Sequence, residues 1–247
     1  MIYSFICVLL ITFLATLVRS TFGFGESLVA VPLLSIFMPV SLAVPLSVLI
    51  SVLVALVVVV QDHRQIHFKS ARWLIVSALP GIPIGLLILV YGNKIWVKTI
   101  LGLFIIAYSL YALYGSNRLR LDEESKPWLL LCGFLSGVLG GAYGINGPPL
   151  VVYGNMRKWT PKQFRATLQG YFLPASLAGI IGYLAKGMIT YQLGQYFLLT
   201  VPAIIPAIFL GRYFNHKLKE EFFKYVYFGL LVIGLLLIVL SGLKAAG

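Results

Sequence analysis

Two glycine-rich segments carry the residue types that most readily hold a small ion in an otherwise apolar chain. The first reads Phe22-Gly23-Phe24-Gly25-Glu26, and the second, residues 140–149, contains four glycines, two adjacent prolines and Asn146. Neither segment favours a continuous helix, because glycine is entropically costly there and proline lacks a backbone N–H. We therefore expect a broken helix at each segment, with polar backbone groups facing the gap.

The second segment has the chemistry of an anion site. Pro148 and Pro149 suit the first turn of a new helix. The N–H groups of that turn would face the break together with the positive end of the helix dipole. The Asn146 amide and the Tyr143 hydroxyl add donors. The alternative is that the glycines only let helices pack closely, as small residues do in membranes.

The expected binding residues come from both breaks and from one later helix. They are Phe22, Gly23, Gly25, Glu26, Tyr143, Gly144, Asn146, Gly147, Pro148 and Gln169. Gln169 shares a helix face with Arg165 at the i, i+4 spacing and is expected to lie deeper, near the breaks or the substrate. Arg165 is expected to anchor its helix at the cytoplasmic surface.

Glu26 is the one acid of seven that lies inside an apolar stretch. A carboxylate within a membrane is functional by default, so Glu26 is a candidate for carrying a proton. The alternative is a structural ion pair with Arg19, which lies seven residues earlier on roughly the same face if the helix continues. A charged Glu26 would repel an anion, so we expect Arg19 or protonation to neutralise it.

The sequence supports a catalytic or metal-binding site less well than an anion site. His63 and His67 have the i, i+4 spacing of helical metal ligands, but no third ligand is evident, and a solvated basic loop is the preferred interpretation. Segment 133–137, with Ser136 between glycines, faintly resembles an intramembrane serine protease. All three histidines lie in loops, so a general base is missing. The sequence predicts no enzyme, no metal and no cofactor.

The elements that position these residues are apolar helices. Of the 247 residues, 60% are hydrophobic and only 11% are charged, which excludes both a soluble globular enzyme and a disordered chain. Backbone groups in lipid must be satisfied internally, so the apolar runs are helices, about eight to ten in number, and two of them are too short to cross a membrane alone. The runs cover 2–18, 28–40, 42–60, 73–91, 96–114, 128–143, 148–154, 166–185, 193–211 and 222–243. The fold class is an all-α polytopic membrane protein with two half-helices at the breaks.

The two breaks belong to an internal repeat. Thr21 aligns with Ala142 at a spacing of 121 residues, and Pro80 aligns with Pro202 at 122. The predicted division is a first transmembrane repeat in 1–114, a polar linker in 115–127 and a second transmembrane repeat in 128–247. If the helices of each half make an odd number of passages through the membrane, the loops on one side of the membrane contain 14 of the 19 basic residues and the loops on the other side contain four. The positive-inside rule then predicts inverted repeats with both termini outside the cytoplasm.

Inverted repeats with helices broken at matching positions are typical of secondary transporters, whose binding sites lie near the midplane. Residues 144–154 read Gly-Ile-Asn-Gly-Pro-Pro-Leu-Val-Val-Tyr-Gly and precede Phe164-Arg165-Ala166-Thr167. In the first half, Phe22-Gly23-Phe24-Gly25-Glu26 runs into Val29-Ala30-Val31-Pro32-Leu33. These segments resemble the sulfite exporter TauE/SafE family of membrane transporters over nearly the whole chain. The resemblance implies movement of sulfite, sulfonates and similar sulfur-containing anions across the cytoplasmic membrane.

The sequence therefore predicts a multi-pass transporter of the cell membrane that exports a small sulfur-containing oxyanion by alternating access. Two alternatives stay open at this point, namely a passive anion channel and a scaffold subunit that transports nothing. The expected partners are the anion and the lipid bilayer, with a homodimer left open. Nucleic acid is not expected, because the net charge of +12 is scattered over short loops instead of forming one soluble basic face.

Overall fold

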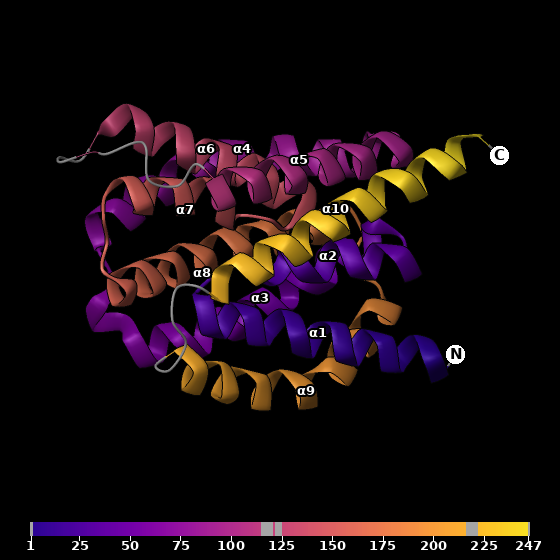
Figure 1. Ribbon diagram of the computed structural model, residues 1–247, viewed down its shortest axis with the longest axis horizontal. Helices are drawn as coiled ribbons and strands as arrows, with labels where there is room; N and C mark the ends of the chain where they lie inside the picture. Colours follow the sequence, from indigo (N-terminus) through magenta and orange to yellow (C-terminus); the bar gives the residue numbers. More distant parts are fainter. Residues whose placement is uncertain (1, 115–120, 122–124, 216–221, 247) are drawn as a thin grey trace.

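The computed structural model describes residues 2–114, 121, 125–215 and 222–246, which form ten α-helices, one short 3₁₀ turn and no strand (Figure 1). The first half contains α1 (Ile2–Phe22), α2 (Glu26–Phe37), α3 (Val40–Asp62), η1 (His63–Gln65), α4 (Phe68–Tyr91) and α5 (Lys94–Tyr114). The second half contains α6 (Lys126–Tyr143), α7 (Gly147–Met156), α8 (Pro161–Ala185), α9 (Tyr191–Asn215) and α10 (Phe222–Ala246). Each apolar run of the sequence corresponds to one helix, which confirms the all-α fold.

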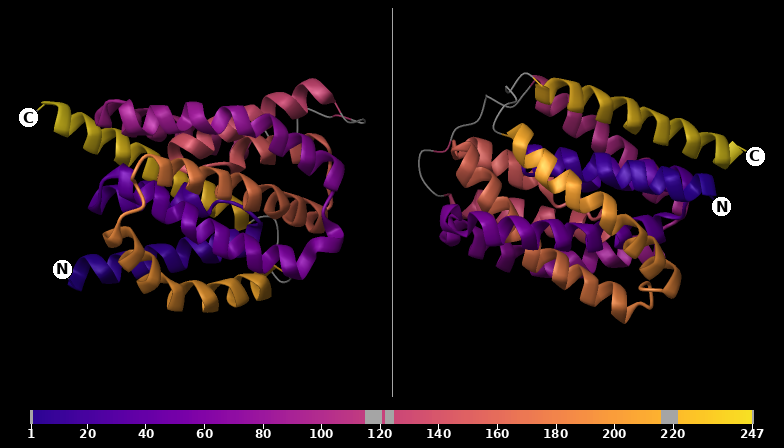
Figure 2. Two further views of the ribbon diagram at one scale, coloured as in Figure 1. Left: turned by 180° about the vertical axis from the view of Figure 1, so that it is seen from behind. Right: turned by 90° about the horizontal axis from the view of Figure 1, so that it is seen from below.

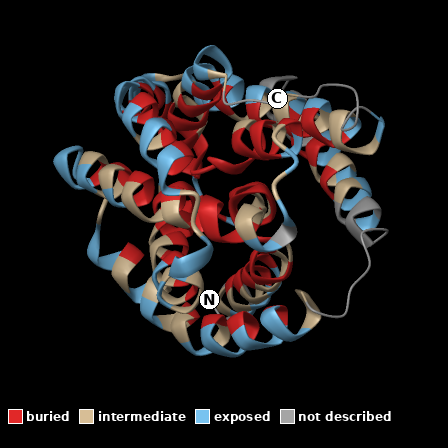
Figure 3. Ribbon diagram, turned by 90° about the vertical axis from the view of Figure 1, so that its left-hand side faces the viewer, coloured by how far each residue is buried: buried red, intermediate tan, exposed pale blue. Residues whose placement is uncertain are grey.

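Helix lengths separate spanning helices from half-helices. Within the described ranges, six helices are long and apolar enough to cross a membrane, namely α1, α3, α4, α5, α8 and α9. By contrast, α2 has 12 residues and α7 has 10, so each rises less than about 20 Å at 1.5 Å per residue. Large apolar side chains such as Leu198 and Ile181 lie on outward faces, where they are 70% and 68% exposed. Buried residues fill the centre of the bundle (Figure 3), which is the distribution of a multi-pass membrane protein.

The chain reverses direction at both breaks. Helix α2 runs back beside α1, and α7 runs back beside α6, so each half makes five passages along the bundle (Figure 1). The beginning of α1 and the end of α10 consequently lie at the same end of the bundle (Figure 2). The 3₁₀ turn η1 and the start of α6 lie at the opposite end. This is the odd passage count that the loop charges predict.

The two halves pack against each other more than within themselves. The most extensive helix pairs are α4 with α6, α1 with α9, α5 with α10 and α3 with α8. Exchanging each helix of the first half with its counterpart in the second half, from α1 with α6 through to α5 with α10, turns the α4–α6 pair into the α9–α1 pair. The same exchange maps the α5–α10 pair and the α3–α8 pair onto themselves. The packing thus has the symmetry that a two-fold repeat requires.

Small residues make the α4–α6 contact close. A Cβ atom built on Gly137 would lie 2.2 Å from the Ala78 carbonyl oxygen, and one on Gly85 would lie 2.0 Å from that of Val138. Glycines on both helices therefore let the two backbones touch, as in other membrane helix pairs. The segment 133–137 belongs to this contact, and its Ser136 hydroxyl donates a hydrogen bond of 2.6 Å to the Asn146 carbonyl. The segment therefore has a packing role in the α4–α6 contact.

Candidate functional site

The first break is a glycine turn between α1 and α2. Gly23 and Gly25 have φ angles of 85° and 96°, in the left-handed region that costs other residues roughly 1–2 kcal/mol. Gly25 is the N-cap residue of α2, and Val29 is the first residue of that helix whose N–H bonds back to it. The N–H groups of Glu26, Ser27 and Leu28 consequently have no partner within the helix.

The second break is built in a similar way with fewer backbone donors. Gly144 ends α6 in the left-handed region at φ 67°, and its N–H bonds to the Gly140 carbonyl at 2.8 Å. Helix α7 begins at Gly147, but Pro148 and Pro149 in its first turn have no N–H. The prolines that favour a helix start therefore remove two of the donors that an anion at this end would need. The donor-rich helix N-terminus is that of α2.

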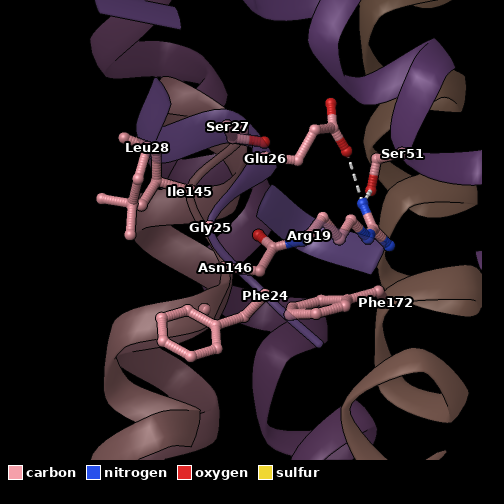
Figure 4. A pocket seen from close by; sticks show the side chains of 12 residues that line it. Arg19, Phe24, Gly25, Glu26, Ser27, Leu28, Ser51, Ile145, Asn146 and Phe172 are labelled. Carbon is pink, nitrogen blue, oxygen red and sulfur yellow. Dashed lines mark hydrogen bonds and ion pairs between the residues drawn. The ribbon is translucent and has the colours of Figure 1, made fainter. Parts of the chain in front are cut away.

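The two breaks meet around one cavity (Figure 4). Its volume is about 20 Å³, and its lining comes from both breaks together with single residues of α1, α3 and α8. The lining residues are Arg19, Phe24, Gly25, Glu26, Ser27, Leu28, Ser51, Gly144, Ile145, Asn146, Gly147 and Phe172. We call this space the central cavity.

Arg19 is the cation of the central cavity, and it is 3% exposed. Its Nη1 donates to the Glu26 carboxylate at 2.5 Å and to the Ser51 hydroxyl at 2.6 Å. Its Nε and Nη2 both donate to Gln169 Oε1, at 3.3 and 2.7 Å. The Phe172 ring lies 4.9 Å from the guanidinium carbon, which adds a cation–π contact. Arg19 is thus held from α2, α3 and α8 at once.

Glu26 is the counter-ion of Arg19 and is 1% exposed. Its second oxygen accepts a hydrogen bond of 3.1 Å from Ser47, whose hydroxyl also contacts that of Ser27 at 3.0 Å. The ion pair forms although the helix does not continue from Arg19 to Glu26. The turn at Gly23 and Gly25 instead brings the start of α2 back beside the end of α1, so the pair forms across the break and not along one helix.

Helix α8 contacts the first break through Arg165 and Gln169. Gln169 Nε2 donates to the Gly23 carbonyl at 2.8 Å, so this side chain joins Arg19 to the turn. A Cβ atom on Gly23 would lie 3.2 Å from Arg165 Cα, so the two backbones are in close contact. Arg165 is 6% exposed and lies beside Asp62, in contrast to the surface anchor that the sequence suggested.

Comparisons with known proteins identify the family. The sulfite exporter TauE/SafE family matches residues 8–238. The chain belongs to this family. It is therefore a membrane transporter by family, rather than a member of an enzyme class, and the family's description names sulfite, a small anion. The TauE/SafE match covers both breaks and the helices around the central cavity.

Individual relatives agree with the TauE/SafE assignment at low identity. The chain is 25% identical to a probable membrane transporter protein of Methanocaldococcus jannaschii over 253 residues, which covers 94% of each chain. It is 23% identical to a probable sulfite/organosulfonate exporter TauE of Cupriavidus necator over 172 residues, which covers 68% of this chain and 67% of the relative. No solved structure matches the chain significantly.

Most of the expected site residues lie together in the folded chain, at or beside the central cavity. Arg19, Gly25, Glu26, Gly144, Asn146 and Gly147 line the central cavity, and Gln169 and Gly23 bind one another at its edge. Phe22, Tyr143 and Pro148 end or begin helices at the breaks but do not line the cavity. The Tyr143 hydroxyl is buried without a hydrogen-bond partner.

Sequence reasoning missed several cavity residues on neighbouring helices. Ser51 and Phe172 contact Arg19 from α3 and α8, and Phe24 lines the cavity between the two glycines of the first break. One signal was available for α3, since Ser47 and Ser51 lie at the i, i+4 spacing inside an apolar run. Phe172 gives no such signal, because an aromatic residue in an apolar helix is ordinary.

The structure shows a helix-capping role for one of the two spaced histidines. The His67 Nδ1 atom accepts a hydrogen bond of 3.4 Å from the Ser70 N–H at the start of α4. His63 lies in the exposed turn η1. Within the part of the chain that the structure describes, no three His, Cys, Asp or Glu side chains are grouped closely enough to hold a metal ion.

Proposed function

We propose that the chain is a secondary transporter that exports small sulfur-containing oxyanions, such as sulfite or organosulfonates, across the cell membrane. The observation that carries the proposal is the central cavity, where two broken helices meet around a buried arginine. The family description and the name of the Cupriavidus necator relative support this substrate class. Membrane transporters with repeated halves place their sites at such paired breaks.

The chemistry of the cavity fits an oxyanion. Arg19 presents a planar fork of N–H groups that matches two oxygens of one anion. The N–H groups of Glu26, Ser27 and Leu28, which have no partner within the helix, lie at the positive end of the α2 dipole. In the arrangement described, Glu26 and Ser51 occupy Arg19 Nη1, and Gln169 occupies Nε and Nη2. The anion must therefore displace Gln169 or the Glu26 carboxylate to bind two donors of Arg19. Asn146 adds a side-chain amide from the opposite break.

The small volume of the central cavity favours a carrier over a permanently open pore. One water molecule needs roughly 10–15 Å³ of such space, so about 20 Å³ holds one water but not an ion of four heavy atoms. Substrate binding therefore requires the breaks to separate. We propose that the two halves, as an inverted pair, rock around the cavity to expose it to each face in turn.

The orientation follows from the loop charges. The end of the bundle that holds η1 and the starts of α6 and α8 carries most of the basic residues, and we place it in the cytoplasm. Both termini then face outward. A negative potential inside the cell favours exit of an anion, so the membrane potential can drive outward uniport.

Sulfite efflux from proteoliposomes tests the proposal. The double variant Arg19→Gln/Glu26→Gln keeps the site electrically neutral, and it should lower kcat/KM for sulfite about 10- to 100-fold because a charged hydrogen-bonding partner contributes about 1.5–3 kcal/mol. Arg64→Gln on the exposed turn η1 is the matched control and should leave the flux unchanged. External sulfite should accelerate efflux of labelled internal sulfite if the protein is a carrier. Wild-type protein that moves no sulfite, sulfonate or thiosulfate would refute the proposal.

A further inference from the structure

We propose that Arg165 forms a second binding site for a small oxyanion, between the basic end of the bundle and the central cavity. Its role in transport rests on the proposed function, whereas anion binding at Arg165 does not. Three features of Arg165 support this site: the burial of its guanidinium, the charges around it and its position beside the first break.

Arg165 is a buried cation whose hydrogen-bonding capacity is mostly unused. The residue is 6% exposed, and its Nε and Nη2 atoms are buried without a hydrogen-bond partner among the residues that the structure describes. The nearest carboxylate is that of Asp62, with 3.6 Å between Arg165 Nε and Asp62 Oδ2, beyond hydrogen-bond distance. Buried arginines normally have their donors paired, because an unpaired charged donor is costly. An anion that accepts from Nε and Nη2 would meet that need.

The charge around Arg165 is positive. Arg212, on the last turn of α9, interacts with Arg165 electrostatically and repels it. Asp62 compensates one of these two positive charges, so the described cluster of Arg165, Arg212 and Asp62 has a net formal charge of +1. Asp62 is 28% exposed, which places one edge of the cluster at the surface of the bundle. An anion can therefore approach the buried guanidinium from this edge.

The first break connects Arg165 to the central cavity. Gly23 touches the Arg165 backbone on one side and accepts from Gln169 on the other, and Gln169 in turn binds Arg19. The ring of Phe24, which lines the central cavity, lies edge-on to that of Phe164 with 6.1 Å between centroids. The two arginines are thus separated by one glycine turn and one aromatic residue. A movement of this turn would join the Arg165 site to the central cavity.

The ligand class follows from the geometry of these donors. Nε and Nη2 of one guanidinium form the edge that binds two oxygens of a single sulfite, sulfate or phosphate group. Burial of the side chain favours a small free ion. The phosphate of an anionic lipid presents the same oxygens, so lipid must be tested separately.

Sulfite-induced thermal stabilisation in lipid-free detergent tests the site. Binding to the folded state raises the apparent unfolding temperature in proportion to ln(1 + [L]/Kd). In the Arg19→Gln/Glu26→Gln background, which disables the central cavity, sulfite should still stabilise the protein. Adding Arg165→Gln should lower the apparent affinity of this remaining effect at least tenfold. Arg64→Gln in the same background is the control and should leave it intact.

Several outcomes separate the hypotheses. Equal sulfite responses with and without Arg165→Gln would overturn the second site. Stabilisation that appears only on adding phosphatidylglycerol, and not sulfite or sulfate, would assign Arg165 to lipid and also overturn it. Arg165→Lys keeps the charge but not the planar fork, so it should fold as the wild type and bind sulfite less tightly. Binding that depends on Arg165 in a wild-type protein without sulfite flux would support the site and refute the proposed function.

Discussion

The ion pair of Arg19 and Glu26 permits a quantitative test through stability. Arg19→Gln leaves the Glu26 carboxylate 1% exposed with Ser47 as its remaining hydrogen-bond partner. Removing one member of a buried pair costs about 3–5 kcal/mol, because the other charge stays buried and uncompensated. Glu26→Gln should cost less, about 1–3 kcal/mol, since Arg19 keeps Ser51, Gln169 and the Phe172 ring.

The double variant decides whether this reasoning holds. Arg19→Gln/Glu26→Gln removes both charges and should be at least about 2 kcal/mol more stable than Arg19→Gln alone. The assay is equilibrium unfolding of the purified protein in mixed micelles with increasing denaturing detergent, followed by circular dichroism. Arg64→Gln, an exposed substitution, should change stability by less than about 0.5 kcal/mol. If the losses of the two single variants simply add in the double variant, the pair is not coupled and the reasoning is refuted.

Two further predictions concern glycines and use the same unfolding assay. Gly144→Ala should lower the free energy of unfolding more than Gly187→Ala, although both glycines have φ 67°. A Cβ on Gly144 would lie 3.0 Å from a valine side chain of α3, whereas one on Gly187 meets nothing within 4 Å. Equal losses of stability would show that backbone strain alone acts at the break. Gly137→Leu should prevent α4 and α6 from packing and abolish recovery of folded protein, whereas Gly194→Ala, in open space on α9, should raise stability by up to about 1 kcal/mol. Folded Gly137→Leu protein with normal stability would contradict the close α4–α6 contact.

The fold was largely predictable because apolar length and helix breakers are local properties of the sequence. Each apolar run became a helix, and the glycines of 22–26 and 140–149 broke the chain where expected. The loop charges predicted the odd passage count, because charge follows the loops and not the packing. Gln169 was also expected near the breaks, since it is a polar residue well inside an apolar run.

The site itself was less predictable. Ser51 and Phe172 face Arg19 because of how α3 and α8 are rotated, and a helix that is apolar on all sides does not encode which face turns inward. Arg165 was expected at the surface because it begins a helix after a basic loop. Its burial depends on Gly23 and Asp62, which lie far from it in the sequence and come close only in the folded bundle.

The interlocking of the two halves has a consequence for biogenesis. The ribosome releases α1 long before α9, its principal packing partner, and 168 residues lie between the end of α1 and the start of α9. At roughly 5–20 residues per second, α1 waits about 10 to 30 s in the insertion machinery or in lipid. Arg19 and Glu26, only seven residues apart, can neutralise each other during that interval, before Gln169 has been synthesised. The short glycine turn between them therefore lets the nascent chain hold two charges in the bilayer while the second half is still being made.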